Sequence, residues 1–171
     1  MPGKTGKEEK IARFGFLLLA PAVFLLDLCV KNQIVRRYAE GRGTPVWEGV
    51  FHLTRVDNTG AAFGILKGRT AFLVGFTALA ALALAVFFVR HLGLWGGSER
   101  PKAYGLRRAG WALLAGGALG NLYDRLARGY IVDYLDFRVW PVFNLSDAAI
   151  CVGAGLAILS YVLCRHASDP V

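Results

Sequence analysis

The chain has 171 residues, of which 55% are hydrophobic and 19% are charged, and its formal net charge at pH 7 is +8. Such a charge would suggest nucleic acid as the partner of a soluble protein, but most basic residues here lie between long apolar segments. Anionic lipid headgroups account for basic residues at those positions better than nucleic acid does. We therefore expect a membrane protein that binds no nucleic acid and has no room for a second domain.

Four apolar segments approach the ~20 residues that an α-helix needs to cross a bilayer. The second of them, residues 70–89, is uncharged and has no polar face, which argues against a buried helix in a soluble bundle. The small-residue pattern of a signal-peptide cleavage site is absent after Leu26, so we expect the first segment to be retained. We predict an all-α integral membrane protein of one domain, residues 1–171, with transmembrane helices over about residues 12–31, 69–91, 107–126 and 145–165.

The segment between the first two helices is not apolar enough to enter the bilayer. Residues 46–56 are rich in β-branched and aromatic side chains, which are typical of strands, and Trp47 and Phe51 suit the headgroup region. We expect a small extracytoplasmic β-sheet here, a cradle over about residues 36–67. Ten basic residues would fall on each side of the membrane, so only the basic cluster before the first helix favours cytoplasmic termini.

Polar residues gather at four places in the sequence: Asp27, residues 58–60, residues 121–125 and residues 133–147. Because consecutive helices alternate in direction, all four places would fall on the same side of the membrane. Ionisable groups at membrane depth are costly and mark functional sites by default. Gly116 and Gly120 have the spacing that lets another helix approach closely beside the third of these places.

The residue types favour carboxylate chemistry at this side. The histidines are isolated and the three cysteines fit no zinc spacing, so we expect no metal and read the cysteines as small buried side chains. A nucleophilic pair of Ser146 with Lys31 is disfavoured because Lys31 lies at a helix end, one turn from Asp27, with which it can pair. The remaining candidates are the carboxylates Asp27, Asp124, Asp133, Asp136 and Asp147.

Two carboxylates that lie close together can share a proton, because both cannot easily ionise. One then acts as a base toward water while the other polarises a peptide carbonyl, and no cofactor is needed. The residues alone leave the pair open, although Asp124 is better explained as the partner of its neighbour Arg125, and Asp136 as a loop residue. A small proton- or ion-coupled transporter or channel is the alternative, but it would need carboxylates spread through the membrane depth.

Five motifs, in this order, resemble those of the bacterial lipoprotein signal peptidases, the signal peptidase II family. They are Asp27-Leu28-Cys29-Val30-Lys31, Asn58-Thr59-Gly60-Ala61-Ala62-Phe63-Gly64, Gly116-Gly117-Ala118-Leu119-Gly120-Asn121-Leu122-Tyr123-Asp124-Arg125, Ile131-Val132-Asp133-Tyr134 and Phe143-Asn144-Leu145-Ser146-Asp147. The resemblance implies that Asp133 and Asp147 are the catalytic pair. It further implies a supporting or substrate-binding set, namely Asp27, Lys31, Asn58, Gly60, Gly117, Asn121, Asp124, Arg125 and Asn144.

The resemblance also implies an activity and its setting. Members are aspartyl endopeptidases of the bacterial inner membrane that cut prolipoproteins just before a cysteine that carries a diacylglyceryl group. They work without a cofactor among membrane lipids, with both termini cytoplasmic and the site near the outer leaflet, and globomycin inhibits them. We expect this chain to do the same as a monomer.

Two features depart from the family pattern. Ser146 stands where an alanine is common, and the segment between Asp133 and Asp147 is short. Asp147 lies where the N-terminus of the fourth helix would favour a negative charge. Asp133 lies in the segment that connects the third and fourth helices, beside apolar neighbours that favour the neutral acid. We therefore expect the shared proton on Asp133.

Overall fold

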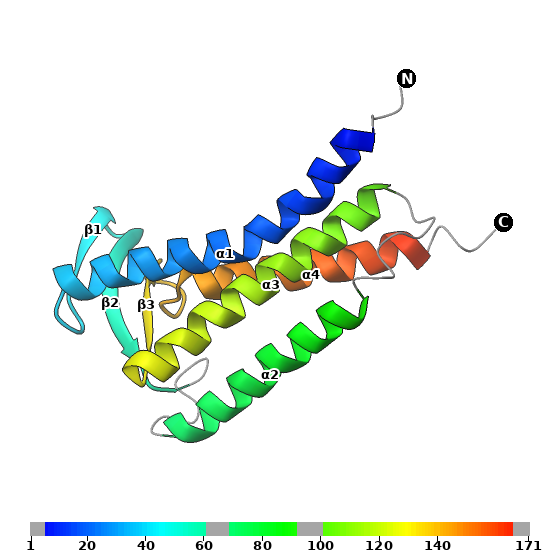
Figure 1. Ribbon diagram of the computed structural model, residues 1–171. Coiled ribbons are helices and arrows are strands. Elements are labelled where there is room, and N and C mark those ends of the chain that lie inside the picture. The colour runs from blue at the N-terminus through cyan, green and yellow to red at the C-terminus, as the bar shows by residue number, and fades with distance from the viewer. Residues whose placement is uncertain (1–5, 61–68, 92–100, 166–171) are drawn as a thin grey trace.

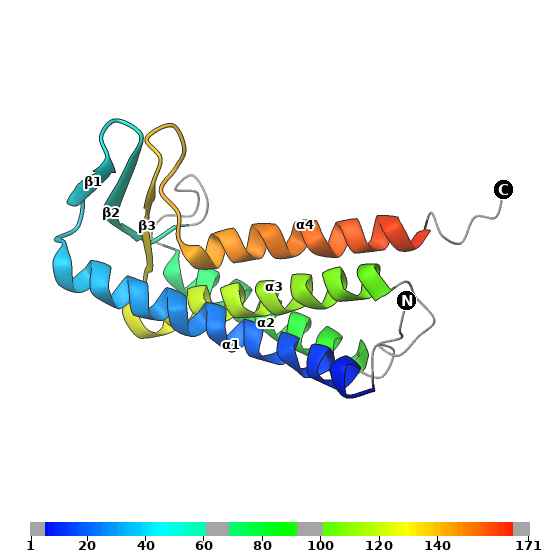
Figure 2. The same cartoon turned by 90° about the horizontal axis from the view of Figure 1, so that it is seen from above.

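The structure is a computed structural model that describes residues 6–60, 69–91 and 101–165. Within these residues the chain forms four helices and a three-stranded antiparallel sheet at one end of the helices (Figures 1 and 2). In chain order the elements are α1 (Gly6–Arg37), β1 (Gly43–Trp47), β2 (Phe51–Asn58), α2 (Thr70–His91), α3 (Pro101–Arg128), β3 (Ile131–Asp136) and α4 (Leu145–Arg165).

The first helix is longer than predicted at both ends, since α1 begins at Gly6 and ends at Arg37. In its last turn the inward side is apolar and the outward side is basic. Ile34 is buried in a cluster with Val132 and Tyr134 of the sheet, while Arg36 and Arg37 are exposed. The helix therefore continues past its apolar segment because its final turns pack on the sheet rather than in lipid.

Glycines let α3 lie close to two other helices. A Cβ atom added at Gly116 would lie 2.6 Å from the carbonyl oxygen of Ala20 in α1. A Cβ atom at Gly110 would lie 2.7 Å from the carbonyl oxygen of Gly153 in α4. The close approach predicted from the spacing of small residues is confirmed, and it brings the polar residues of α3 up to those of α1 and α4.

The sheet differs from the prediction, because its third strand comes from the segment after α3. The strand order is β1-β2-β3, and β3 pairs with β2 so that Val56 faces Asp133 and Asn58 faces Ile131. We had expected Asp133 in a connecting segment. Ile131, Val132 and Tyr134 are β-branched or aromatic, but a six-residue strand whose partner is far away in sequence gives a weak local signal.

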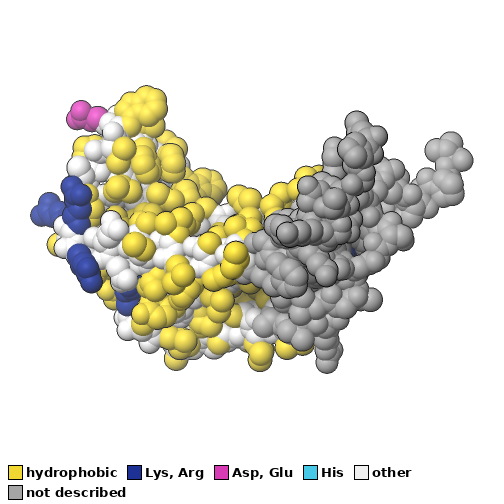
Figure 3. Space-filling view, turned by 45° about the horizontal axis from the view of Figure 1, so that its top comes forward, with side chains coloured by type: hydrophobic (Ala, Val, Ile, Leu, Met, Phe, Trp, Pro, Cys, Tyr) yellow, Lys and Arg dark blue, Asp and Glu magenta, His cyan; other side chains and the backbone are white. Residues whose placement is uncertain are grey.

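The helices have the surface of a membrane protein. Residues 18–37 and 145–164 are each long and apolar enough to cross a bilayer, and α2 contributes a shorter apolar stretch, residues 71–84. Large hydrophobic side chains are exposed on α1, α2 and α4, and Figure 3 shows them covering much of one face, with basic side chains gathered at the sheet end. Apolar exposure of this extent favours contact with lipid.

Candidate active site

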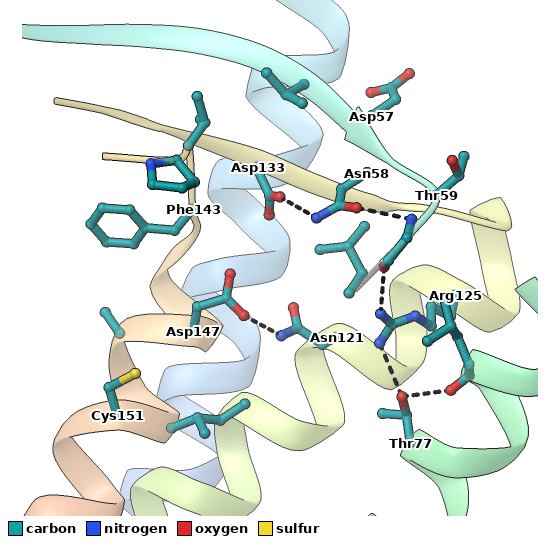
Figure 4. Close-up of a pocket in the computed structure, with 18 of the residues that line it drawn as sticks. Asp57, Asn58, Thr59, Thr77, Asn121, Arg125, Asp133, Phe143, Asp147 and Cys151 are labelled. Carbon is teal, nitrogen blue, oxygen red and sulfur yellow. Dashed lines mark hydrogen bonds between the residues drawn. The ribbon is translucent and has the colours of Figure 1, made fainter. Parts of the chain in front are cut away.

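A cavity of about 970 Å³ lies where the sheet meets α2, α3 and α4 (Figure 4). Asp133 from β3 and Asp147 from α4 both line it, together with Asn58, Asn121 and Arg125. The rest of the wall is largely apolar, and its larger side chains are Phe72, Leu73, Phe76, Ile131, Trp140, Val142, Phe143 and Ile150. The cavity thus combines two carboxylates with a surface suited to an apolar ligand.

Asp133 is almost completely buried, with 2% of its surface exposed. One carboxyl oxygen accepts a hydrogen bond from the Asn58 side-chain amide at 2.9 Å, and the other accepts one from Asn144 at 2.7 Å. Burial and the negative charge of Asp147 raise the pKa of Asp133 to about 7, although the two amides favour its ionised form. Asp133 can therefore hold a proton near neutral pH.

Asp147 lies in the first turn of α4, where the helix N-terminus favours a negative charge. Its carboxylate accepts a hydrogen bond from the Asn121 side chain at 2.7 Å and another from the Asn144 backbone N–H at 3.3 Å. In return the Asn144 side-chain oxygen accepts the backbone N–H of Asp147 at 2.8 Å. Asn144 therefore caps α4 and touches both aspartates.

Lys31 of α1 is buried behind the cavity with 1% of its surface exposed. Its ammonium group has three donors and three acceptors: Asp27 at 2.6 Å, Asp124 at 2.9 Å and the Asn121 side-chain oxygen at 3.2 Å. The pairing of Asp27 with Lys31 that we predicted from their spacing is confirmed. Because Lys31 occupies the oxygen of the Asn121 amide, the nitrogen of that amide is directed toward Asp147.

We predicted from their adjacency that Asp124 pairs with Arg125, and this prediction is wrong. The partners of Asp124 are Lys31, the Arg128 guanidinium one turn later, and the backbone N–H of Val132 at 3.0 Å. Adjacent residues on a helix point in different directions, whereas residues four apart share a face. Arg125 turns instead into the cavity wall, where it donates to the Gly60 carbonyl at 3.1 Å and to the Thr77 hydroxyl at 2.9 Å.

Ser146, at the position where the sequence departs from the family pattern, is fully buried between α3 and α4. Its hydroxyl donates to Asp27 at 2.7 Å, and its backbone N–H donates to the same carboxylate at 3.3 Å. Gly117 and Gly120 lie against it, and a Cβ atom at either would collide with Ser146. The extra hydroxyl is therefore matched to the buried acceptor on α1 and to small residues on α3.

Asp136 is not part of the cavity, so it does not compete with Asp133. It accepts hydrogen bonds from the Thr54 hydroxyl at 3.0 Å and from the backbone and side chain of Arg138. Burial would raise the pKa of Asp136, but the bonds from Arg138 and Thr54 outweigh it and hold that pKa below its ordinary value. Asp136 is therefore a structural residue, but it is the buried last residue of β3 and not the loop residue that we predicted.

The structure separates the predicted site residues into two groups. Asn58, Gly60, Asn121, Arg125, Asp133 and Asp147 line the cavity, while Asp27, Lys31, Gly117, Asp124 and Asn144 lie behind its wall. Sequence reasoning missed Thr77 and Cys151, which also line the cavity. The prediction of buried cysteines is wrong for Cys29 and Cys151, which are exposed.

Comparisons with known proteins agree with this geometry. The family model described as Signal peptidase (SPase) II matches residues 19–163. The lipoprotein signal peptidase of Halothermothrix orenii is 42% identical over 137 residues, which are 80% of this chain and 88% of that protein. The lipoprotein signal peptidase of Moorella thermoacetica is 46% identical over 138 residues, which are 81% of this chain and 86% of that protein.

A solved structure of a bacterial membrane enzyme has the same fold. It superposes with a TM-score of 0.77 at 28% sequence identity and covers 92% of this chain and 93% of its own. A second bacterial membrane enzyme superposes with a TM-score of 0.70 at 29% identity, covering 86% and 92%. The resemblance carried by the five motifs is confirmed over most of the sequence, and the chain belongs to the signal peptidase II family.

Proposed function

We propose that this protein is a membrane aspartic endopeptidase that removes the signal peptide of diacylglyceryl-modified prolipoproteins, cutting on the N-terminal side of the lipidated cysteine. The observation that carries the proposal is that Asp133 and Asp147, from separate elements, line one cavity whose other walls are mostly apolar. The substrate class follows from the relatives, which are named lipoprotein signal peptidases.

The two aspartates have different surroundings and therefore different roles. Asp133 carries the proton, since its pKa is about 7, and Asp147 carries the charge, since two N–H donors and a helix N-terminus face it. Asp147 takes a proton from water as the water oxygen bonds to the scissile carbonyl carbon, and Asp133 gives its proton to the carbonyl oxygen. The resulting diol collapses as Asp147 passes its proton to the leaving nitrogen and a diol hydroxyl returns one to Asp133.

The positions of the helix ends support the membrane setting that we propose. The C-terminal parts of α1 and α3 and the N-terminal parts of α2 and α4 lie at the sheet end (Figure 1). Four spanning helices would then leave both termini on one side of the membrane. We assign that side to the cytoplasm because of the basic cluster before the first apolar segment, and the cavity then lies near the outer leaflet of the inner membrane. The prolipoprotein would enter laterally from lipid as a one-to-one complex with a monomer, and globomycin would compete for the same cavity.

The transporter alternative is not favoured by the position of the carboxylates. Asp27, Asp124, Asp133 and Asp147 lie together at the sheet end, and α2 carries no carboxylate along its length. A translocation path needs polar groups through the whole membrane depth.

The proposal is tested with the purified protein and a lipid-modified precursor in detergent. We expect cleavage before the modified cysteine, read by mass spectrometry, and no cleavage of the same precursor without its diacylglyceryl group. Asp133→Asn and Asp147→Asn should each lower turnover by about a thousandfold or more, because neither residue works without the other. Asp136→Asn is the matched control and should cleave normally. Cleavage by both dyad variants at the wild-type rate would refute the assignment.

A further inference from the structure

Thr77 is the only polar side chain between residues 71 and 89, in the middle of a helix that otherwise presents apolar groups. It nevertheless lines the cavity, and Figure 4 shows it directed toward Arg125 of α3. A threonine on an apolar helix usually satisfies its hydroxyl within its own helix. The Thr77 hydroxyl does donate a hydrogen bond within its own helix, to the Leu73 carbonyl at 2.7 Å, but it also has a partner on another helix.

The direction of the hydrogen bonds at Thr77 is fixed by chemistry. A guanidinium group can only donate, so the contact between Arg125 and Thr77 at 2.9 Å makes the hydroxyl oxygen an acceptor. The single hydroxyl proton is then directed to Leu73. Because its proton is donated to the Leu73 carbonyl of α2, the Thr77 hydroxyl oxygen is oriented to accept a hydrogen bond from Arg125.

Among the described residues, the hydrogen-bond partners of Arg125 are neutral oxygens. Its two contacts are with Thr77 and with the Gly60 carbonyl, and in the part of the chain that the structure describes it forms no ion pair with a carboxylate. A guanidinium has five N–H groups, and these contacts use two of them. Within the described residues its charge thus has no direct carboxylate partner, and it lies in the wall of the cavity that holds Asp133 and Asp147.

We propose that Thr77 is a positioning residue for the reaction, which holds the Arg125 guanidinium in the cavity wall so that its remaining N–H groups face the peptide backbone of the substrate. The inference rests on the proposed function, because it needs a peptide in the cavity. It also gives α2 a role: Phe72, Leu73 and Phe76 form part of the apolar wall, and the Thr77 hydroxyl links that part to Arg125 on the polar side of the site.

The first test removes the Thr77 hydroxyl while keeping the shape of the side chain. Thr77→Val should raise KM for the lipid-modified precursor about five- to tenfold, the loss expected for a hydrogen bond to a charged group, while kcat stays within about twofold. Thr77→Ser keeps the hydroxyl and should restore the wild-type KM. Thr54→Val is the matched control, since Thr54 donates to Asp136 outside the cavity and its loss should leave KM unchanged.

A double-mutant cycle then asks whether Thr77 acts through Arg125. Binding of a fluorescent lipid-modified signal peptide is measured by anisotropy in wild-type and Arg125→Lys backgrounds, so that no turnover is needed. Thr77→Val should weaken binding in the first background and have no further effect in the second. Equal losses in both backgrounds, or an unchanged KM in Thr77→Val, would overturn the inference. Thr77→Ala gives the same comparison if valine lowers the melting temperature. Failure of the wild type to cleave would count against the proposed function instead.

Discussion

Asn144 and Asp147 exchange hydrogen bonds in both directions across the first turn of α4. This reciprocal arrangement is a capping box, in which the residue before the helix and the third residue within it satisfy each other's backbone N–H groups. Here the third residue is also a member of the proposed catalytic pair, and the remaining group of Asn144, its side-chain amide, donates to the other member, Asp133. One residue therefore both starts the helix and sets the spacing of the pair.

The substitution Asn144→Ser should separate the capping of α4 from the hydrogen bond to Asp133. Asn144→Ser keeps a good helix cap but has too short a side chain to reach Asp133, so we expect little change in melting temperature and a fall in turnover of about tenfold or more. Asn144→Ala should show the same fall and also lose about 1 kcal/mol of stability. Thermal unfolding and cleavage rates measured on the same samples check both statements. A fully active Asn144→Ser would mean that Asp133 does not need this amide.

The pH dependence should report Asp133. Its pKa is raised to about 7, so the proton that the reaction needs is lost as the pH rises through 7, and kcat/KM should fall on the alkaline side. The sign for stability is the same: a carboxyl whose pKa is raised by folding stabilises the fold at low pH and loses that contribution as the pH rises toward 7. The wild type should thus lose stability relative to Asp133→Asn between about pH 4 and 7. A difference in unfolding free energy between wild type and Asp133→Asn that does not change with pH would contradict this prediction.

Removing the charge of Asp124 should destabilise the protein more than it slows cleavage. Lys31 and Arg128 both lose a buried partner in Asp124→Asn, and breaking a buried ion pair costs about 3 kcal/mol or more. Asp136→Asn is the control, because its partner Arg138 is 53% exposed and the pair is screened by solvent. Melting temperature and activity per folded molecule are the measurements. An inactive Asp124→Asn with a normal melting temperature would move Asp124 into the catalytic machinery.

Gly120 and Ser146 should be coupled in a double-mutant cycle. A Cβ atom at Gly120 would collide with the Ser146 hydroxyl and lie 2.9 Å from an oxygen of Asp27. Gly120→Ala alone should therefore cost about 1–3 kcal/mol through overpacking, and Ser146→Ala in the same molecule should recover part of that loss. Additive effects on unfolding free energy would show that the two side chains do not meet.

Cys151 offers a direct probe of the cavity. It lies one helical turn after Asp147, is exposed and lines the cavity, whereas Cys29 is exposed on α1 away from it. A bulky maleimide on Cys151 should block cleavage in a Cys29→Ala protein, and the same reagent should have no effect in a Cys151→Ala protein. Bound lipid-modified peptide should slow the labelling of Cys151. Full activity after complete labelling of Cys151 would place the substrate elsewhere.

Local sequence signals predicted the helices and the gathering of polar residues at one end, because both depend on periodic apolar segments and on alternating helix direction. They did not predict the pairing of β3 with β2 or the partners of Asp124, since these contacts join distant segments or require knowing which helix face is turned inward. Thr77 is visible in the sequence as a single hydroxyl in an apolar helix, but its role could not be predicted without knowing that Arg125 lies beside it.

The buried charges of the bundle bear on how the chain enters the membrane. Lys31 and Asp27 are four residues apart in α1, and Arg128 and Asp124 are four residues apart in α3, so each helix brings its own oppositely charged pair. Each of these two pairs can therefore enter the bilayer with its opposite charges already compensated during synthesis, before the neighbouring helices exist. The contact between Lys31 and Asp124 forms only afterwards, when α1 and α3 associate. It joins the two ion pairs into one network that holds α1 against α3.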